Sequence, residues 1–251
     1  MSRAFVAGVL LFCLSGSLNA AEIRIAVASN FKPTLQLLAP DFKEKTGHEL
    51  IVSSASTGKL YAQITHGAPY DIFMSADEKY ADLLIANNIA GKDGAYIYAL
   101  GKLLFVSNIA DDNGCKQVLM SPELRRLAIA NYKIAPYGLA AKQVLDNLGL
   151  WQGLRSKVVM GENIAQTFQF VFTKNADAGF VAQSLLEMAS FDEVYACLWR
   201  VPTDLYSPIK QKMVVLNKAK NKNAVEAFVR YIKSSDARDI TETTGYGTLD
   251  N

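Results

Sequence analysis

The sequence predicts an α/β protein of two lobes, each a mostly parallel sheet flanked by helices, joined by strands that cross from one lobe to the other. Short apolar runs alternate with segments of helical periodicity along the chain. The same strand–turn–helix pattern recurs in two units of similar size, and no Pro-, Gly- or Ser-rich linker separates them. With 251 residues the chain can bury the cores of two such units.

Residues 1–21 have the pattern of a secretory signal peptide. Arg3 is the basic start, residues 4–14 are apolar, and residues 18–21 offer small side chains for cleavage near Ala20 or Ala21. The apolar run is short for a membrane span, so an uncleaved anchor is the less favoured alternative. We therefore expect the mature chain to be exported.

The first unit opens with a strand over residues 23–28, which ends at Ser29 and Asn30. These two residues favour helix N-caps, and Pro33 falls where the first helical turn would begin. The predicted helix ends at Gly47, and Pro40 is expected to kink or split it.

Two further strand–helix pairs follow in the first unit. A strand over 49–53 leads through residues 54–61 into a helix that stops at Gly67. A strand over 71–75 precedes a helix from Asp77 to about residue 87, and residues 95–107 favour one or two more strands. Strands that alternate with helices in this way imply a parallel sheet with right-handed crossovers.

The second unit repeats the pattern. A short helix is predicted to begin at residues 121–123, followed by strands over 127–131, 158–160 and 178–182 and by helices over 139–148 and 164–174. Strands over 195–201 and 208–216, an amphipathic helix over 224–234 and a short last helix complete the chain. We expect residues 22–103 and 208–251 to form one lobe and residues 104–207 to form the other.

Charge and cysteine content limit the function classes. The net charge is +2, and removal of Arg3 with the leader leaves 25 basic and 24 acidic residues, which gives no support to a nucleic-acid partner. Cys115 and Cys197 remain after cleavage. In an oxidising compartment they either form a disulfide or stay as two separate buried thiols, and the sequence leaves both open.

Four turns carry the candidate chemistry, each between the end of a strand and the start of a helix. They are Ser29-Asn30, Ser56-Thr57-Gly58, Tyr137-Gly138 and Asn163-Ile164. Ligands of open α/β sheets bind at this edge, and helix N-termini favour anions. A single such turn is usually only a helix cap. Four at equivalent places, two per unit, predict a site between the lobes where neutral donors hold a deprotonated anion.

An enzyme is the main rival class. The only histidines, His48 and His66, stand at the ends of predicted elements, and known nucleophile, metalloprotease and nucleotide-binding motifs are missing from the sequence. A hydrolase built on Ser29 would need a base that the sequence does not offer. We therefore predict a protein without catalytic activity and without a cofactor.

Three segments show a resemblance to a known family. IAVASNF at residues 25–31, SSASTGKLYAQI at 53–64 and GAPYDIFMSAD at 67–77 resemble the periplasmic molybdate-binding proteins of ABC importers, the ModA family. The likeness covers the whole mature chain and loosens after the first hundred residues. It implies a two-lobed, type II periplasmic-binding-protein fold that closes on molybdate or tungstate.

The resemblance also implies a ligand set. Ser29 and Asn30 match the family's first ligand pair, and Thr57 matches the hydroxyl residue of the second turn, with Ser56 a close rival. Tyr137 and Ile164 match positions that contact the oxyanion mainly through backbone N–H groups. One branch of the family adds a tyrosine where this chain has Ala182, which puts a further side-chain contact in doubt.

These expectations combine into one prediction. The mature chain is a periplasmic monomer that captures molybdate or tungstate and delivers it to an ABC permease in the inner membrane. The alternative is a binding protein for sulfate or another tetrahedral oxyanion, and a receptor for an organic solute comes third. No metal site is expected beyond the metal of the oxyanion.

Overall fold

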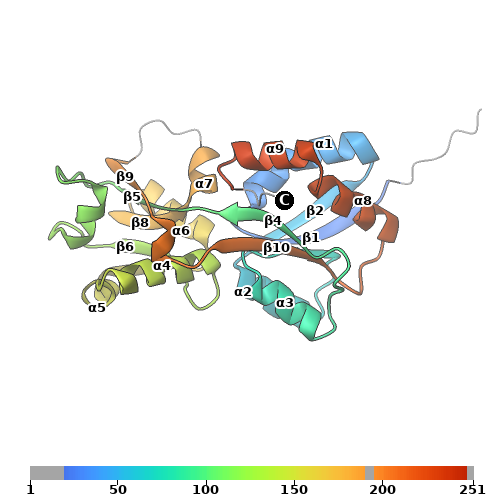
Figure 1. Cartoon of the computed structure of the whole chain (residues 1–251), viewed down its shortest axis with the longest axis horizontal. Coiled ribbons are helices and arrows are strands. Elements are labelled where there is room, and N and C mark those ends of the chain that lie inside the picture. Colours follow the sequence, from blue (N-terminus) through green and yellow to red (C-terminus); the bar gives the residue numbers. More distant parts are fainter. Residues whose placement is uncertain (1–19, 190–194, 248–251) are drawn as a thin grey trace, which may run out of the picture.

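In the computed structural model, residues 20–189 and 195–247 are described, and their strands form two five-stranded sheets. Figure 1 shows the sheets at opposite ends of the long axis, each with helices around it. We call the sheet that contains the first strand and its helices the first lobe, and the other sheet with its helices the second lobe.

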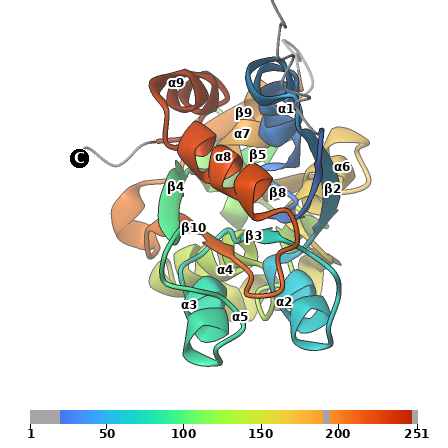
Figure 2. The ribbon, with the colours of Figure 1, turned by 90° about the vertical axis from the view of Figure 1, so that its right-hand side faces the viewer.

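The first lobe contains β1 (Glu22–Ala28), α1 (Lys32–Thr46), β2 (Glu49–Ala55), α2 (Thr57–Thr65), β3 (Ile72–Met74), α3 (Lys79–Ala86), β4 (Tyr96–Gly101), β10 (Ile209–Val215), α8 (Lys222–Ile232) and α9 (Ser235–Thr243). Its strand order is β2-β1-β3-β10-β4. Figure 2 shows α1, α8 and α9 on one face of this sheet and α2 and α3 on the other. The sheet is therefore covered on both faces, as its predominantly apolar strands require.

The second lobe contains β5 (Leu103–Ser107), the 3₁₀ helix η1 (Cys115–Met120), β6 (Leu127–Ala130), α4 (Pro136–Asn147), α5 (Trp151–Leu154), the 3₁₀ helix η2 (Arg155–Lys157), β7 (Val158–Gly161), α6 (Ile164–Phe172), β8 (Ala178–Ala182), α7 (Gln183–Glu187), β9 (Cys197–Arg200) and the 3₁₀ helix η3 (Thr203–Leu205). Its strand order is β7-β6-β8-β5-β9.

The two sheets are built alike. In each, the first strand of a βαβ unit pairs in parallel with two neighbours, β1 with β2 and β3, and β6 with β7 and β8. The remaining two strands join antiparallel, β10 with β3 and β4, and β5 with β8 and β9. The predicted two-lobed α/β fold is confirmed, and the repeat places equivalent strand ends of both lobes at the cleft.

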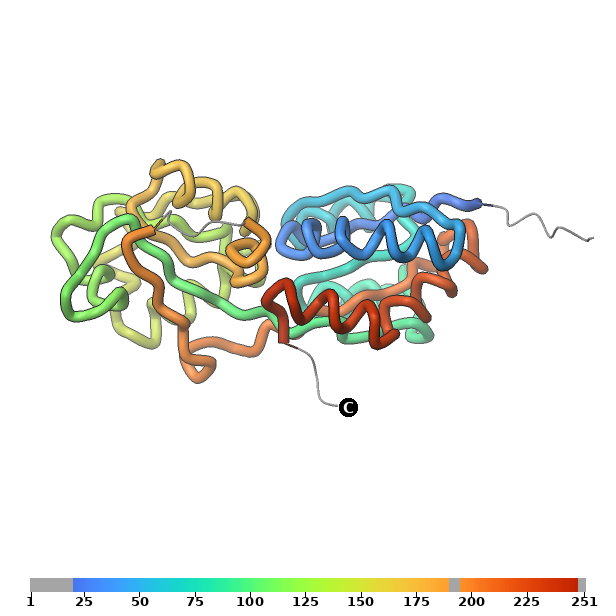
Figure 3. Tube along the Cα trace, turned by 90° about the horizontal axis from the view of Figure 1, so that it is seen from above, coloured from blue at the N-terminus to red at the C-terminus, as the bar shows by residue number. Residues whose placement is uncertain are grey.

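Two chain segments connect the lobes. A single residue, Lys102, separates β4 in the first sheet from β5 in the second, and the chain returns after η3 into β10. Figure 3 shows these two segments crossing side by side between the lobes. Short, paired crossings of this kind allow the lobes to bend about a common hinge.

The structure differs from two local predictions. The helix predicted to begin at residues 121–123 is wrong: the helical turn is η1, which ends at Met120 before that segment. Pro40 lies inside α1, which continues to Thr46 as one helix. Since Leu35, Leu38 and Phe42 of α1 are fully buried, packing on the sheet keeps this helix whole across the proline.

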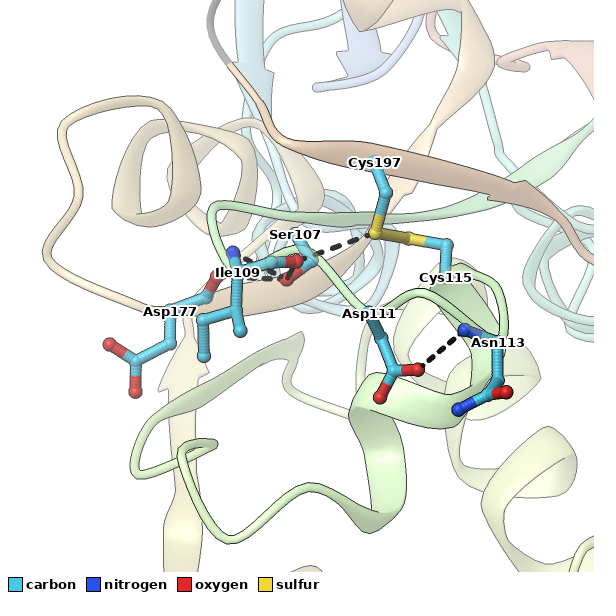
Figure 4. The surroundings of a disulfide bond; sticks show 7 residues. All are labelled: Ser107, Ile109, Asp111, Asn113, Cys115, Asp177 and Cys197. Carbon is cyan, nitrogen blue, oxygen red and sulfur yellow. Dashed lines mark hydrogen bonds between the residues drawn. A yellow bond between two sulfur atoms is a disulfide. The ribbon is translucent and has the colours of Figure 1, made fainter.

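The cysteines form a disulfide. Cys115 of η1 and Cys197 of the edge strand β9 are bonded, with their Cα atoms 5.4 Å apart. Figure 4 shows the bond beside the loop after β5, where Cys197 Sγ lies 3.5 Å from the carbonyl oxygen of Ile109. Of the two options that the sequence left open, the structure has the covalent one. The bond ties the edge of the second sheet to the loop that packs against it.

The predicted signal peptide falls almost wholly outside the described residues, which begin at residue 20. Among the described helices, none combines the length and the apolar character needed to cross a membrane.

Candidate functional site

The four predicted turns meet at one small cavity between the lobes. The cavity is lined by residues of β-strand ends and helix starts: Ala28, Ser29, Asn30, Ala55, Ser56, Thr57, Ala76, Ala135, Pro136, Tyr137 and Ile164. All five residues predicted from the sequence, Ser29, Asn30, Thr57, Tyr137 and Ile164, are among them, and each is at most 8% exposed. The structure therefore brings the two lobes' turns together at a single place.

The first turn presents a backbone N–H group. Ser29 N–H donates to Ala55 O across the sheet, Phe31 N–H donates to Ala28 O, and Leu35 N–H then makes the first bond of α1 to Phe31 O. The N–H of Asn30 lies between these donors, and none of the described residues accepts from it. The Ser29 side chain, 8% exposed, also lines the cavity.

The side-chain amide of Asn30 is already hydrogen-bonded within the protein. Its Nδ2 donates to Gln211 Oε1 at 2.8 Å and to Tyr246 OH at 2.9 Å, so both amide protons are used inside the protein. Its Oδ1 is buried and has no hydrogen-bond partner among the described residues. The backbone N–H of Asn30, rather than its side-chain amide, is the donor available in this structure.

The second turn presents two hydroxyl groups. Ser56 is the N-cap residue of α2, and its buried Oγ lacks a hydrogen-bond partner in the described part of the chain. Thr57 Oγ1 accepts from Ala76 N–H at 3.2 Å, which leaves the hydroxyl proton free to be donated elsewhere. Ser56, the rival that the sequence left open, thus stands beside Thr57 with an unused hydroxyl.

The third turn begins α4 in the second lobe. Pro136 has no N–H and is preorganised for the first helical turn, and the first intrahelical bond runs from Leu139 N–H to Ala135 O. The N–H of Tyr137 therefore precedes the helix's own hydrogen bonds. Gly138 is required here, since a Cβ at this position would lie 2.2 Å from Ala130 O.

The fourth turn begins α6. Asn163 is its N-cap, and the Asn163 side chain accepts from Gln166 N–H at 3.0 Å. The first intrahelical bond is donated by Thr167 to Asn163 O, so the N–H of Ile164 is again free of the helix. Asn163 is thereby fixed as a cap, and Ile164 supplies the donor.

Contacts across the cleft hold the lobes together around the cavity. Gly58 N–H of α2 donates to Ile134 O of the second lobe at 2.9 Å, and Lys59 Nζ lies 2.7 Å from Glu162 Oε1. Since both side chains are about half exposed, at 50% and 47%, this ion pair contributes less than about 1 kcal/mol.

The cavity is electrically neutral and small. Among the described residues that line it, Tyr137 is the only titratable one, and burial raises the pKa of the Tyr137 hydroxyl well above its ordinary value. Its volume is about 10 Å³, which is about the space that one water molecule needs and too little for an amino acid or a sugar. Neutral dipoles that point at one small space suit a single anion.

The histidines and another hollow of the described chain lack this convergence of neutral helix starts. His48 Nδ1 accepts from Ala21 N–H, and the His66 ring lies 2.7 Å from Ala62 O, away from the cavity lining. A larger hollow of about 520 Å³ lies beside α8, where apolar side chains and exposed charges surround it without convergent helix starts. Within the described residues, no cluster of three or more His, Cys, Asp or Glu could hold a metal ion.

Comparisons with known proteins agree with this geometry. The family model of bacterial extracellular solute-binding proteins matches residues 23–247. The molybdate-binding protein ModA of Azotobacter vinelandii is 40% identical over 248 residues, covering 95% of this chain and 93% of the relative. The ModA protein of Rhodobacter capsulatus is 36% identical, covering 91% of this chain and 89% of the relative.

A solved structure is similar over the same length. The periplasmic molybdate-binding protein of Azotobacter vinelandii superimposes with a TM-score of 0.85 at 36% identity, covering 91% of this chain and all of that chain. The likeness therefore extends over both lobes and the cleft between them.

Proposed function

Because this chain belongs to the ModA family of bacterial extracellular solute-binding proteins, we propose that it captures molybdate, or tungstate, in the cleft and delivers it to an ABC permease. The observation that supports this most directly is the convergence of four helix starts, two from each lobe, on one small buried cavity. The relatives are named as molybdate-binding proteins. The cleft of this chain has the neutral donors that a naked oxyanion requires.

The proposed ligand set has two kinds of donor. Hydroxyl groups come from Ser29 and Thr57, with Ser56 as an addition suggested by its unpartnered Oγ. Backbone N–H groups come from Asn30, Tyr137 and Ile164. Roughly six donors to a charged acceptor, at about 1.5–3 kcal/mol each, outweigh the cost of association by enough for a micromolar or tighter dissociation constant.

The site also supports a pure binding role. Its lining offers no carboxylate or imidazole that could act as a general base toward Ser29. We therefore propose that the protein releases its anion chemically unchanged and needs no cofactor. A chromogenic ester turned over at a rate above background would contradict this proposal.

The remaining parts of the proposal concern location and assembly. Residues 1–21 act as a cleaved signal peptide, and the mature protein works in the periplasm as a monomer. One lobe comprises residues 22–102 and 208–251 and the other residues 103–207, one residue from the expected boundary because Leu103 begins β5 of the second sheet. Closure of the lobes presents a joint surface of both to the permease in the inner membrane.

Calorimetry on the mature chain tests the proposal. We expect tight binding of molybdate and tungstate and weak binding of sulfate and phosphate. Ser29→Ala and Thr57→Ala should each weaken molybdate binding by about 10-fold to 150-fold, because each removes one hydrogen bond to a charged acceptor. Thr173→Ala, on the exposed C-terminal end of α6, is the matched control and should bind like the wild type. Tight sulfate binding with weak molybdate binding would overturn the choice of ligand.

A further inference from the structure

Gln211 is a fully buried polar residue in the hinge. It lies in β10, the strand that returns the chain from the second lobe to the first, and its side chain is 0% exposed. The pairing of β10 with β4 shifts register between Gln211 and Lys212, where Tyr98 of β4 has no partner in the register. A buried amide must find hydrogen-bond partners. The partners of Gln211 therefore indicate what this buried side chain holds in place.

The Gln211 amide makes hydrogen bonds to both lobes. Its Oε1 accepts from Asn30 Nδ2 at 2.8 Å and from Tyr98 OH at 3.1 Å, both in the first lobe. Its Nε2 donates to Tyr137 OH at 3.1 Å, in the second lobe. Asn30 and Tyr137 belong to two of the four turns at the cavity. One side chain thus connects a turn of each lobe behind the cavity.

The contacts of the Tyr137 hydroxyl with the hinge depend on how the two lobes are placed relative to each other. A Cβ on Gly101, the last residue of β4 before the crossing, would lie 2.4 Å from Tyr137 OH. The Tyr137 hydroxyl therefore rests directly against the hinge backbone, between Gly101 and Gln211. If the lobes move apart, Tyr137 leaves both contacts, while the bonds of Gln211 to Asn30 and Tyr98 stay within the first lobe.

We propose that Gln211 is a positioning residue that stabilises the closed form and orients Asn30 and Tyr137 for the anion. This inference rests on the proposed function of the cleft. In the closed form Gln211 fixes the side chains of two residues whose backbone N–H groups face the cavity. In the open form its bond to Tyr137 is lost. Gln211 thereby slows ligand release without touching the ligand.

The network around Gln211 is uncharged, which suits a site for an anion. Burial raises the pKa values of Tyr98 and Tyr137 well above the ordinary tyrosine range, so both hydroxyls remain protonated and uncharged at neutral pH. The described groups that face Gln211 from the neighbouring elements are the hydroxyls of Tyr98, Tyr137 and Tyr246 and the Asn30 amide. Gln211→Glu would place a carboxylate behind the anion and should weaken binding more than removal of the amide.

The test uses Gln211→Met, which keeps the length of the side chain. Asn30 Nδ2 then keeps one of its two bonds, to Tyr246 OH, and Tyr98 OH keeps its bond to Ser75 O. Radiolabelled molybdate is loaded on the mature protein and chased with unlabelled molybdate. We expect release to be about threefold to tenfold faster with association unchanged within about twofold. The molybdate-induced decrease in radius of gyration, from small-angle X-ray scattering, should become smaller.

Tyr137→Phe is a second variant for the same release assay, and it keeps the test possible if Gln211→Met folds poorly. It removes the same interlobe hydrogen bond while leaving the Tyr137 backbone N–H in place. The double variant should release molybdate no faster than the faster single variant, since both single variants remove the same interlobe hydrogen bond. Tyr231→Phe, which deletes a buried hydroxyl bonded to Leu38 O in the first lobe, is the control for stability alone and should release at the wild-type rate.

The outcomes separate the two proposals. If the wild type binds molybdate but both single variants release it at the wild-type rate, the role of Gln211 is wrong and the proposed function stands. Additive effects in the double variant would likewise overturn the shared-bond explanation. If the wild type does not bind molybdate, the proposed function fails, and the role of Gln211 fails with it.

Discussion

Gly58 is the residue at which lobe closure can be tested most directly. It lies in the first turn of α2, and its N–H donates to Ile134 O across the cleft at 2.9 Å. A Cβ added to Gly58 would lie 2.9 Å from Ile134 Cβ and 3.1 Å from Ile134 Cα. It would also lie 2.9 Å from Tyr80 OH, the tip of a side chain that can turn away. Gly58→Ala therefore places a methyl group against the backbone of the opposite lobe.

The substitution should change stability and affinity in opposite directions. Alanine is favoured over glycine inside a helix by about 1 kcal/mol, so the unliganded, open protein should be as stable as the wild type or more stable. In the closed form the added methyl group overpacks the interface, which costs about 1–3 kcal/mol. Because only the closed form encloses the anion, molybdate should bind about fivefold to 150-fold more weakly.

Two measurements on the mature chain decide the matter. Calorimetry gives the molybdate dissociation constant, and urea denaturation without ligand gives the free energy of unfolding. Gly153→Ala in α5 is the matched control, since a Cβ there would meet no atom within 4 Å, and it should leave affinity unchanged. A wild-type dissociation constant for Gly58→Ala would refute the reasoning, because the lobes would then close without bringing Gly58 onto Ile134.

Two further predictions concern stability. Reduction of the Cys115–Cys197 disulfide, which closes a sequence separation of 82, should lower the unfolding free energy by about 4.5 kcal/mol in the chain-entropy model, as measured by urea denaturation with and without dithiothreitol. An unchanged denaturation midpoint would contradict this. Tyr246 is fully buried, and burial raises the pKa of its hydroxyl. Because the unfolded tyrosine ionises near pH 10 while the folded one stays protonated, stability should fall as the pH rises above about 10. Tyr246→Phe should reduce that slope by up to about 1.4 kcal/mol per pH unit, and an identical slope in denaturation curves from pH 9 to 11 would count against it.

The sequence was sufficient for the fold class and for five of the residues that line the cavity. Strand ends and helix starts are local features, and N-cap residues or a proline mark all four turns. The repeat of the pattern in both units allowed the four turns to be placed around one point. Whether each of the five residues contacts an anion stays a prediction.

Other features depend on contacts between distant segments, which local pattern cannot supply. Nothing near Asn30 in the sequence indicates that its amide protons go to Gln211 and Tyr246, which are 181 and 216 residues away. The close approach of Gly58 to Ile134 is equally non-local. The helix expected at residues 121–123 was wrong because Ser121 and Pro122 resemble a helix start but follow η1 instead.

The position of β10 also affects the order in which the chain folds. This strand lies between β3 and β4 in the first sheet, yet more than a hundred residues separate it from β4 along the chain. In that sheet β4 has β10 as its neighbour, so the amino-terminal segment cannot complete its hydrogen-bonded ladder until the carboxy-terminal part is available. For a polypeptide that is threaded across a membrane, this arrangement delays compaction until translocation is nearly finished. Hydrogen exchange on a fragment that stops before Ile209 should therefore find the amides of β4 unprotected.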